Sequence, residues 1–567
     1  MKISDVEKIT GLTAKAIRLY EEKGLITVER KDNSYREYNE NSVNRLKQIK
    51  LLRDIGIGIS EIVLYYNNIV TLEELLHKRK KELEKESNQN KENYYACIQM
   101  LDDIFVDDSI NNNQIAVLSE CKSVIAIDIG TTSISAVIID AENNCVLETY
   151  TVDNDSKIIT DPIFSEFDVE RITDKSKRIV DYLIKAYPNT SAIGITGQMH
   201  GVVYTDKNGK AVSPLYNWQD SRGNCEYKNG KTYCEEIEKL TGYRVFSGYG
   251  FSTLFYNKVN KINPENAYSF CTIMDYFALY LAGLSLPIIH PSNAASLGLF
   301  DLEKNEFDLS AIEKIGLNNL TIPTVSKEDN IVGHYCEIPV VAAIGDNQAS
   351  FFGSVKNEKS ALVNFGTGSQ ISVVTDTFKK VNENLELRPY LFGKYLVCGS
   401  ALCGGRAYSI LEKFFSAFAR EINSEHGSSY DIMDALAEKA YNNNSALNVS
   451  TLFCGTRNNP DLRGSIDGIS DINFKPENLI LGFLQGMVNE LKEYFDYMNI
   501  SDISGLTASG NAVQKTPVLQ KLLADTFGYE LSLTDSREEA AIGAALYAGL
   551  CCDIMNREQI SEIIKYK

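Results

Sequence analysis

The 567-residue chain has few of the side chains that mark metal sites and disulfides. It has five histidines, and no two are spaced as zinc ligands, so we expect no structural metal site. The twelve cysteines are scattered without a CxxC pair, and no signal-like apolar segment follows Met1 and Lys2. We therefore expect reduced thiols in a cytoplasmic protein.

Long apolar runs are also missing. The longest, around Tyr276–Ile289, is interrupted by Pro287 and is shorter than a bilayer span, so we expect no membrane segment. The 76 acidic residues outnumber the 57 basic ones, and the net charge of −19 argues against a chain that coats nucleic acid or anionic membranes. Residues 1–53 differ, because twelve Lys/Arg against eight Asp/Glu give them +4 and leave −23 for the rest.

A mass of 63.3 kDa is too large for one hydrophobic core. With 44% hydrophobic and 23% charged residues, the composition is typical of a folded globular protein. We expect about three to five domains, of which the first is basic.

The first 38 residues have the pattern of a helix-turn-helix followed by a β-ribbon wing. Ser4–Glu7 predicts a capping box, Gly11 ends that helix, and Thr13 can cap a second helix that runs to Gly24. The alternating residues from Ile26 onward predict the wing. Lys15 and Arg18 place cations on the second helix, as contact with DNA phosphates requires. Taken alone, the pattern also fits a plain helical hairpin.

The strings in this region are more specific. They include Thr10–Thr13, Ala16–Glu21, Gly24–Ile26, Tyr35–Tyr38 and Leu52–Gly56, and they closely resemble the MerR family of winged-helix transcription regulators. The resemblance implies binding to double-stranded DNA. The side chains we expect to contact DNA are Lys15, Arg18, Tyr20, Arg36 and Tyr38.

A further capping box, Thr71–Glu74, predicts a helix that runs to about Phe105. Every seventh residue can form the seam of a helix pair: Leu76, Leu83, Asn90, Cys97 and Ile104. MerR relatives dimerise through such a helix, which favours a homodimer. The alternative is a solvated linker helix, which the charged run at Lys78–Lys81 favours.

Two strand–turn–strand elements occur more than 200 residues apart. The first has its turn at Asp128–Thr132, and the second at Gly366–Ser369. Glycines, hydroxyls and amides in such turns suit a phosphate, and an aspartate at a strand end can hold Mg²⁺. Either turn alone fits an ordinary β-turn. Together they predict a duplicated α/β fold, an actin-like (ribonuclease H-like) pair of lobes that closes over one nucleotide.

Further segments resemble the FGGY family of carbohydrate kinases in their order along the chain. They are Ile193–Gly201, Trp218–Arg222, Gly345–Ser350, Ala508–Asn511 and Ala540–Ala545, and the resemblance runs from Ser123 to Gly549. Two further strings, Ser292–Ser296 and Gly510–Val513, look most like the sedoheptulokinase branch. Xylulokinases share the Gln198–Gly201 string, so a xylulose-like substrate stays open.

The resemblance implies phosphorylation of a ketose by ATP with Mg²⁺. It assigns Asp346 as the acceptor of the sugar proton, and Asp128 is our candidate metal-associated carboxylate. The expected nucleotide and phosphate contacts are Thr131, Thr132, Gly366, Thr367, Gly368, Gly404, Gly405, Gly510 and Asn511. The expected sugar contacts are Gln198, Met199, His200, Trp218, Asp220, Arg222, Asp275 and Asn347. For Asp220 and Arg222, pairing with each other is an equal alternative.

The predicted organisation has five parts. They are a winged helix at 1–70, a dimerisation helix at 71–108, a linker at 109–122, and kinase lobes at 123–355 and 356–567. We expect a ketose kinase whose sugar occupancy also biases DNA binding. One alternative is a sugar-responsive regulator that uses the kinase fold as a sensor with little turnover. Another is a working kinase whose head has lost specific DNA binding.

Overall fold

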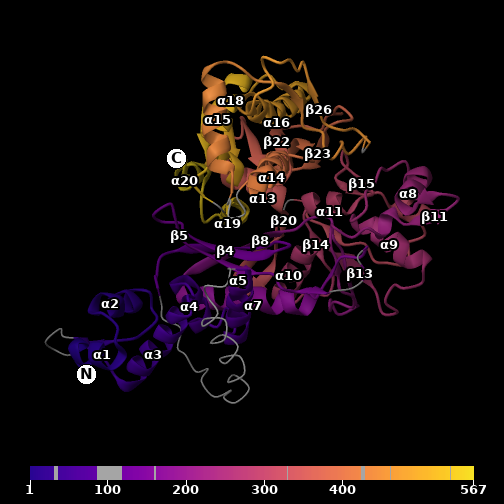
Figure 1. The fold of residues 1–567 in the computed structure, drawn as a ribbon. Coiled ribbons are helices and arrows are strands. Elements are labelled where there is room, and N and C mark those ends of the chain that lie inside the picture. Colours follow the sequence, from indigo (N-terminus) through magenta and orange to yellow (C-terminus); the bar gives the residue numbers. More distant parts are fainter. Residues whose placement is uncertain are drawn as a thin grey trace.

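A computed structural model shows a small helical head against the first of two α/β lobes (Figure 1). The structure describes residues 1–30, 36–85, 118–158, 161, 163–327, 330–422, 428–459, 461–536 and 538–567. Within these ranges no helix is both long enough and apolar enough to span a membrane.

The head consists of short helices and a two-stranded wing. Its elements are α1 (Ile3–Thr10), α2 (Ala14–Glu22), β1 (Glu29–Arg30), β2 (Arg36–Glu37), α3 (Glu40–Asp54) and α4 (Ile59–Tyr66). Thr13 caps α2 as predicted, because its hydroxyl accepts from the Ala16 amide at 3.3 Å. The predicted capping box at Ser4 is wrong, since α1 begins at Ile3 without a side-chain cap. Glu7 instead accepts from the Ala14 amide at 2.7 Å, and so it supports the start of α2.

Helix α5 (Leu72–Lys85) begins at the predicted capping box. The Thr71 amide donates to Glu74 at 2.8 Å, and the Glu74 amide donates to the Thr71 hydroxyl at 3.1 Å. Leu76 and Leu83 were expected to begin a dimer seam, but both are buried in the head's own core and are not available to a partner. The remaining seam positions, from Asn90 onward, lie outside the described residues.

The first lobe is built on a sheet with strand order β18-β19-β8-β3-β4-β5. These strands are β3 (Ser123–Ile129), β4 (Ser133–Asp140), β5 (Cys145–Asp153), β8 (Thr190–Gly197), β18 (Ile331–Tyr335) and β19 (Ile338–Val341). Strand β3 is antiparallel to β4 and parallel to β8, and the short β20 (Ile344–Gly345) also pairs with β8. The turn at Gly130–Thr132 therefore emerges beside the ends of β8 and β20.

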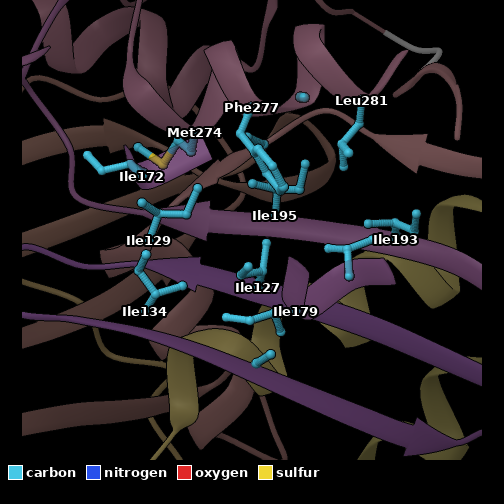
Figure 2. Close-up of a cluster of buried hydrophobic side chains, with 14 of the residues drawn as sticks. Ile127, Ile129, Ile134, Ile172, Ile179, Ile193, Ile195, Met274, Phe277 and Leu281 are labelled. Carbon is cyan, nitrogen blue, oxygen red and sulfur yellow. The ribbon is translucent and has the colours of Figure 1, made fainter. Parts of the chain in front are cut away.

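One face of this sheet is covered by α7 (Val169–Ala186) and α10 (Ile273–Ala282). Figure 2 shows the apolar side chains that fill the space between the sheet and these two helices. The strands contribute Ile127, Ile129, Ile134, Ile193 and Ile195, and the helices contribute Ile172, Ile179, Met274, Phe277 and Leu281. This dry core fixes the strand ends from which the site residues project.

The second lobe repeats the pattern, with strand order β23-β24-β22-β21-β27-β28. Its strands are β21 (Ser360–Phe365), β22 (Ser369–Thr375), β23 (Glu386–Pro389), β24 (Tyr395–Ala401), β27 (Gly505–Ser509) and β28 (Leu531–Leu533). Strand β21 is antiparallel to β22 and parallel to β27, as β3 is to β4 and β8. The duplicated fold that the two turns predicted is confirmed.

Two helices join the lobes. Helix α13 (Asp346–Ser354) follows the first sheet, and α19 (Glu539–Cys551) comes from the end of the chain. Helix α19 nevertheless packs on the first lobe, where its apolar residues share a core with Val124 and Val137. The core around α19 also includes Leu362 and Leu396 of the second lobe, so this helix packs between the two sheets.

The crossing of α13 and α19 needs glycine. A Cβ at Gly543 would lie 1.8 Å from the Ala349 carbonyl oxygen, and one at Gly194 would lie 2.3 Å from the Ala544 carbonyl oxygen. Backbone carbonyls cannot move aside as flexible side chains do, so the helices have no room for larger residues here.

We expect Gly543→Ala to lower the free energy of unfolding by about 1–3 kcal/mol, the usual cost of overpacking, because the two helices must separate. Thermal unfolding measures the change. Gly505→Ala is the matched control, since its new Cβ would meet only the Ser360 hydroxyl at 3.4 Å. Equal melting temperatures for G543A and wild type would contradict the tight crossing.

Candidate active site

A cavity of about 710 Å³ is lined by residues of both lobes. The predicted site residues that line it are Asp128, Met199, His200, Trp218, Asp346, Asn347, Thr367 and Gly368. Motifs from distant parts of the sequence therefore meet in one place. The cavity holds two aspartates, a histidine, an indole and a glycine turn.

Asp128 lies near the end of β3, opposite Thr196 of β8. Its Oδ1 is buried and has no hydrogen-bond partner among the described residues. Burial, together with the nearby carboxylates of Asp346 and Glu538, raises the pKa of Asp128 from 3.8 to about 7. A carboxylate in such a position is stabilised by any cation that enters the cavity.

Asp346 is the first residue of α13 and follows β20. Burial raises the pKa of Asp346 to about 6, although the Asn347 amide and the Arg388 guanidinium oppose the rise. A carboxylate with a pKa close to neutrality is well matched to accepting a proton from a substrate hydroxyl.

The second glycine turn packs against the start of α14 (Gly405–Ile422). The Gly405 amide donates to the Gly366 carbonyl at 3.0 Å, and a Cβ at Gly404 would lie 2.5 Å from the Gly368 carbonyl carbon. Gly404 and Gly405 were expected to let the backbone approach the nucleotide. In the structure they let the two loops approach each other, which brings the N-terminus of an 18-residue helix to the turn. Helix N-termini favour phosphate groups.

The remaining nucleotide candidates lie on the same strand ends. Gly510 follows β27 with φ +100°, and its Cβ would lie 2.4 Å from the Phe365 carbonyl oxygen, so glycine is required there. Asn511 is exposed at the start of the next helix, and Thr132 is exposed in the first turn. Gly510, Asn511 and Thr132 do not line the cavity themselves.

The residues present fit a nucleotide-bound magnesium ion. Magnesium in such sites takes one or two carboxylates and completes its shell with phosphate oxygens and water. The unpartnered Oδ1 of Asp128, with Asp346 and Glu538 nearby, supplies that donor set. Within the described ranges, no group of three or more His, Cys, Asp or Glu side chains is arranged to hold a metal by itself.

His200 forms part of the wall of the first lobe. Its ring stacks on Tyr249 at 4.4 Å, and its backbone has a strained φ of 72°. Nδ1 donates to the Ser296 carbonyl at 2.8 Å, since a carbonyl only accepts. Burial, with a smaller effect of Arg388, lowers the pKa of His200 to about 4. The ring is therefore neutral, and Nε2 is left to accept a hydrogen bond.

Trp218 links this wall to the first phosphate turn. Its indole is 47% exposed, and Nε1 donates to the Thr131 hydroxyl at 3.0 Å. The Thr131 hydroxyl in turn donates to Gln198 Oε1 at 3.4 Å. Thr131 and Gln198 thus support the cavity from behind Trp218.

Four predicted sugar contacts do not line the cavity: Gln198, Asp220, Arg222 and Asp275. Arg222 Nε donates to Asp220 at 2.7 Å, and both side chains are buried, so the alternative in which they pair with each other is the one observed. Asp275 is also buried, and it accepts from the Thr272 hydroxyl at 2.6 Å and from Asn293 at 3.0 Å. The polar groups of Asp220, Arg222 and Asp275 are satisfied inside the lobe, where they support the strands behind the site.

Several cavity residues were not predicted. They are Gln370, Arg388, Arg457, Glu538 and Glu539. Arg388 lies on a short strand without a turn motif, so nothing local distinguishes it from a surface arginine. Glu538 and Glu539, at the start of α19, are adjacent acidic residues that the sequence shows, but acidic residues at that position usually stabilise the helix N-terminus.

The expected DNA-contacting residues divide into two sets. Lys15 and Arg18 are exposed on α2, as DNA contact requires. Tyr20 and Tyr38 are only 5% and 1% exposed, so the expectation that they touch DNA is wrong. They pack in the head's core and support α2.

The remaining expected DNA contact, Arg36, is exposed on the wing but already has a partner. Its Nε donates to Glu21 of α2 at 2.7 Å. Arg36 therefore braces the wing against α2, and it would have to exchange Glu21 for a phosphate to contact DNA.

Models of the FGGY family of carbohydrate kinases match residues 123–353 as the N-terminal domain and 361–552 as the C-terminal domain. The chain belongs to this family. A MerR HTH family regulatory protein model matches residues 1–68. The protein is therefore an FGGY carbohydrate kinase with a MerR-type helix-turn-helix head.

Curated relatives include the sedoheptulokinase of Mus musculus, which is 24% identical over 74% of this chain and 96% of its own length. The xylulose kinase of Staphylococcus xylosus is 23% identical over 75% of this chain and 90% of its own length. Among solved structures, the xylulose kinase of Rhodospirillum rubrum has a TM-score of 0.66 at 19% identity, covering 78% of this FGGY chain and 93% of that one. The glycerol kinase of Plasmodium falciparum with ADP has a TM-score of 0.65 at 21% identity, with coverages of 77% and 91%.

We expect Asp128→Asn to stabilise this kinase. Because folding raises the pKa of Asp128 from 3.8 to about 7, the folded protein keeps a proton that the unfolded chain has lost, and stability falls as the pH rises through that window. The melting temperature of D128N should exceed that of wild type by a margin that grows from about pH 4 to about pH 7. Calorimetry at several pH values measures it.

Asp502→Asn is the control, because the Asp502 side chain is 77% exposed. A D128N advantage that is the same at every pH would contradict the buried-carboxylate origin.

Proposed function

We propose that this protein transfers the γ-phosphoryl group of ATP to a sedoheptulose-like or xylulose-like ketose, with Mg²⁺. The observation that carries the proposal is the meeting of Asp128, Asp346 and His200 with the second glycine turn in one cavity. Curated relatives that are ketose kinases support the substrate class.

Each side chain has a role in this reaction. Asp346 orients the sugar hydroxyl and takes its proton, and in a loose transition state the proton moves late. The neutral Nε2 of His200 accepts from another sugar hydroxyl, while Trp218, Met199 and Asn347 bound the sugar. A magnesium ion at Asp128 would neutralise charge on the phosphate oxygens.

Phosphate and adenosine contacts follow from the two turns. The amides of Thr131, Thr132 and Gly366–Gly368 hold the phosphates together with the hydroxyls of Thr132 and Thr367, assisted by the N-terminus of α14. Gly510 and Asn511 face the adenosine. In the proposed complex, the sugar lies on the side of the first lobe and ATP lies on the side of the second lobe.

A panel of sugars tests the proposal. We expect ATP consumption with sedoheptulose or xylulose, and little with glycerol. Asp346→Asn should lower kcat by about 10²–10⁴-fold, the usual contribution of a general base. Fluorescence of Trp218, the chain's one tryptophan, should still report sugar binding in that variant. Binding without turnover of any sugar would favour the sensor alternative, and full activity of D346N would refute the role of Asp346.

The proposal also includes coupling between the kinase and DNA binding. Support comes from the contact between head and first lobe, where α4 and α5 lie beside α7 (Figure 1). Leu64 and Ile69 of the head belong to the core of the first lobe. Glu74 of α5 pairs with Lys175 at 3.4 Å and with Arg178 at 3.3 Å.

Hydrogen bonds continue from this contact to the first phosphate turn. Lys175 Nζ also donates to Asp155 at 2.7 Å. The neighbouring Asn154 donates from its side chain to the Gly130 carbonyl at 2.8 Å and from its amide to the Thr132 carbonyl at 2.9 Å. A shift of the turn upon phosphate binding would therefore reach Glu74 through a few bonded groups. The dimer through which MerR relatives act remains part of this proposal.

We expect Lys175→Met to uncouple the two activities. Arg171 and Arg178 still pair with Asp155 and Glu74, so neither carboxylate is left without a cation. In wild type, sugar with a non-hydrolysable ATP analogue should change affinity for a duplex from upstream of the gene by about 5–150-fold, the usual range of coupling. In K175M that change should vanish while kcat is kept.

Lys185→Met is the matched control, because Lys185 is exposed on the same helix. An unchanged sugar effect on DNA binding in K175M would refute the route. No binding of the duplex by any form would favour a head without DNA specificity.

A further inference from the structure

The wall of the cavity that belongs to the second lobe carries an arginine that has no assigned role. Arg388 lies on β23 and lines the cavity. Its Nε and Nη2 both donate to Glu386 Oε2, at 3.0 and 2.5 Å, and its side chain is 13% exposed. Within the described ranges Nη1 has no hydrogen-bond partner, which leaves one donor edge of a held guanidinium available to a ligand.

Glu386 connects this arginine to the other lobe. Its second oxygen accepts from Arg457, which also lines the cavity. Arg244 of the first lobe donates to the Arg457 carbonyl at 3.3 Å and to Asn458 at 2.6 Å. The cluster that orients Arg388 lies within the second lobe, and the first lobe contacts it through Arg244.

The cluster lies on the sugar side of the cavity. Burial is the main cause of the lowered pKa of His200, and the next cause is the charge of Arg388. Burial would raise the pKa of Glu386, but Arg388 and Arg457 outweigh it and hold that pKa at about 2. Arg388 is thus a fixed cation in the same cavity as the neutral His200, and its charge is felt at that ring.

The charge balance indicates a neutral ligand. Two arginines and Glu386 give the cluster a net charge of +1, and four carboxylates also line the cavity: Asp128, Asp346, Glu538 and Glu539. An anionic sugar would meet those carboxylates as well as the cluster. A neutral polyol accepts from the guanidinium without that repulsion.

We propose that Arg388 contacts the acceptor sugar and sets its specificity, donating to hydroxyls on the side away from His200, with Glu386 as its positioning residue. The inference rests on the proposed sugar kinase activity and adds the second lobe to the sugar site. Longer sugars place more hydroxyls beyond the one that Asp346 holds, so they form more hydrogen bonds with Arg388.

The test compares Arg388→Met, Arg388→Lys and Arg557→Met. Arg557 is the matched control, since it also pairs with a glutamate, Glu358 at 3.0 Å, but does not line the cavity. R388M should raise the KM of the preferred sugar by about 10–100-fold, as the loss of a charged hydrogen bond does, and leave the KM of ATP unchanged. The seven-carbon ketose should lose more than the five-carbon one.

Two further variants keep the result interpretable. R388K keeps the charge but loses the planar fork, and it should show a smaller rise in sugar KM even if R388M melts too early to assay. Glu386→Gln should raise the sugar KM without changing the KM of ATP, because it frees Arg388 from its orientation. Equal sugar KM values for R388M, R388K and R557M would overturn the inference.

Failure of the proposed activity is distinguishable from failure of this inference. If wild type consumes no ATP with any sugar, titration of sugars against Trp218 fluorescence still compares R388M with R557M. Weaker sugar binding by R388M alone would uphold the contact, and equal binding would overturn it.

Discussion

The close crossing of α13 and α19 is the constraint on which the rest of the kinase depends. Asp346 begins α13, and Glu538 and Glu539 lie at the start of α19, so the crossing decides how far apart these carboxylates lie. Helix α19 also meets β8 at Gly194, and β8 pairs with the strand that carries Asp128. Glycine at the contacts thus lets one helix pair position every carboxylate of the cavity.

The result is a site that opposes the stability of its own fold. Burial raises the pKa of Asp346 to about 6, and burial together with repulsion from Asp346 and Glu538 raises the pKa of Asp128 to about 7. Such groups cost free energy in the empty protein, and the apolar cores of the two lobes must offset that cost. A cation that entered the cavity would relieve the repulsion at Asp128, so its binding would recover part of that free energy.

What the sequence could predict follows from how local each feature is. The turns at Asp128–Thr132 and Gly366–Ser369 and the histidine after Met199 have local strings, and the structure places them around one cavity. Tyr20 and Tyr38 lie in equally clear strings but are buried. The burial of these side chains depends on neighbours from distant segments of the chain, and a local sequence motif does not contain that information.

Asp220, Arg222 and Arg388 show that a local motif is neither sufficient nor necessary for a residue to line the cavity. The first two lie in a sugar-kinase string but pair with each other inside the lobe. Arg388 lies in no recognisable sequence motif. It reaches the cavity because β23 pairs at the edge of the sheet whose other strands carry the second glycine turn. A strand's place in a sheet is set by long-range pairing, so its side chains acquire a role only in the folded chain.

The head is attached where it meets both a sheet edge and the site. Strand β5 is the last strand of the first sheet, and an edge strand leaves backbone groups to be covered. The head lies against the end of β5, where Glu74, Lys175 and Thr151 line one cavity. The Thr151 hydroxyl also donates to Glu538 at 3.1 Å, and Glu538 lines the active-site cavity. The head thus lies within one strand of the carboxylates that line the active-site cavity. Its contact with the first lobe uses the acidic Glu74, and the basic Lys15 and Arg18 stay exposed on α2.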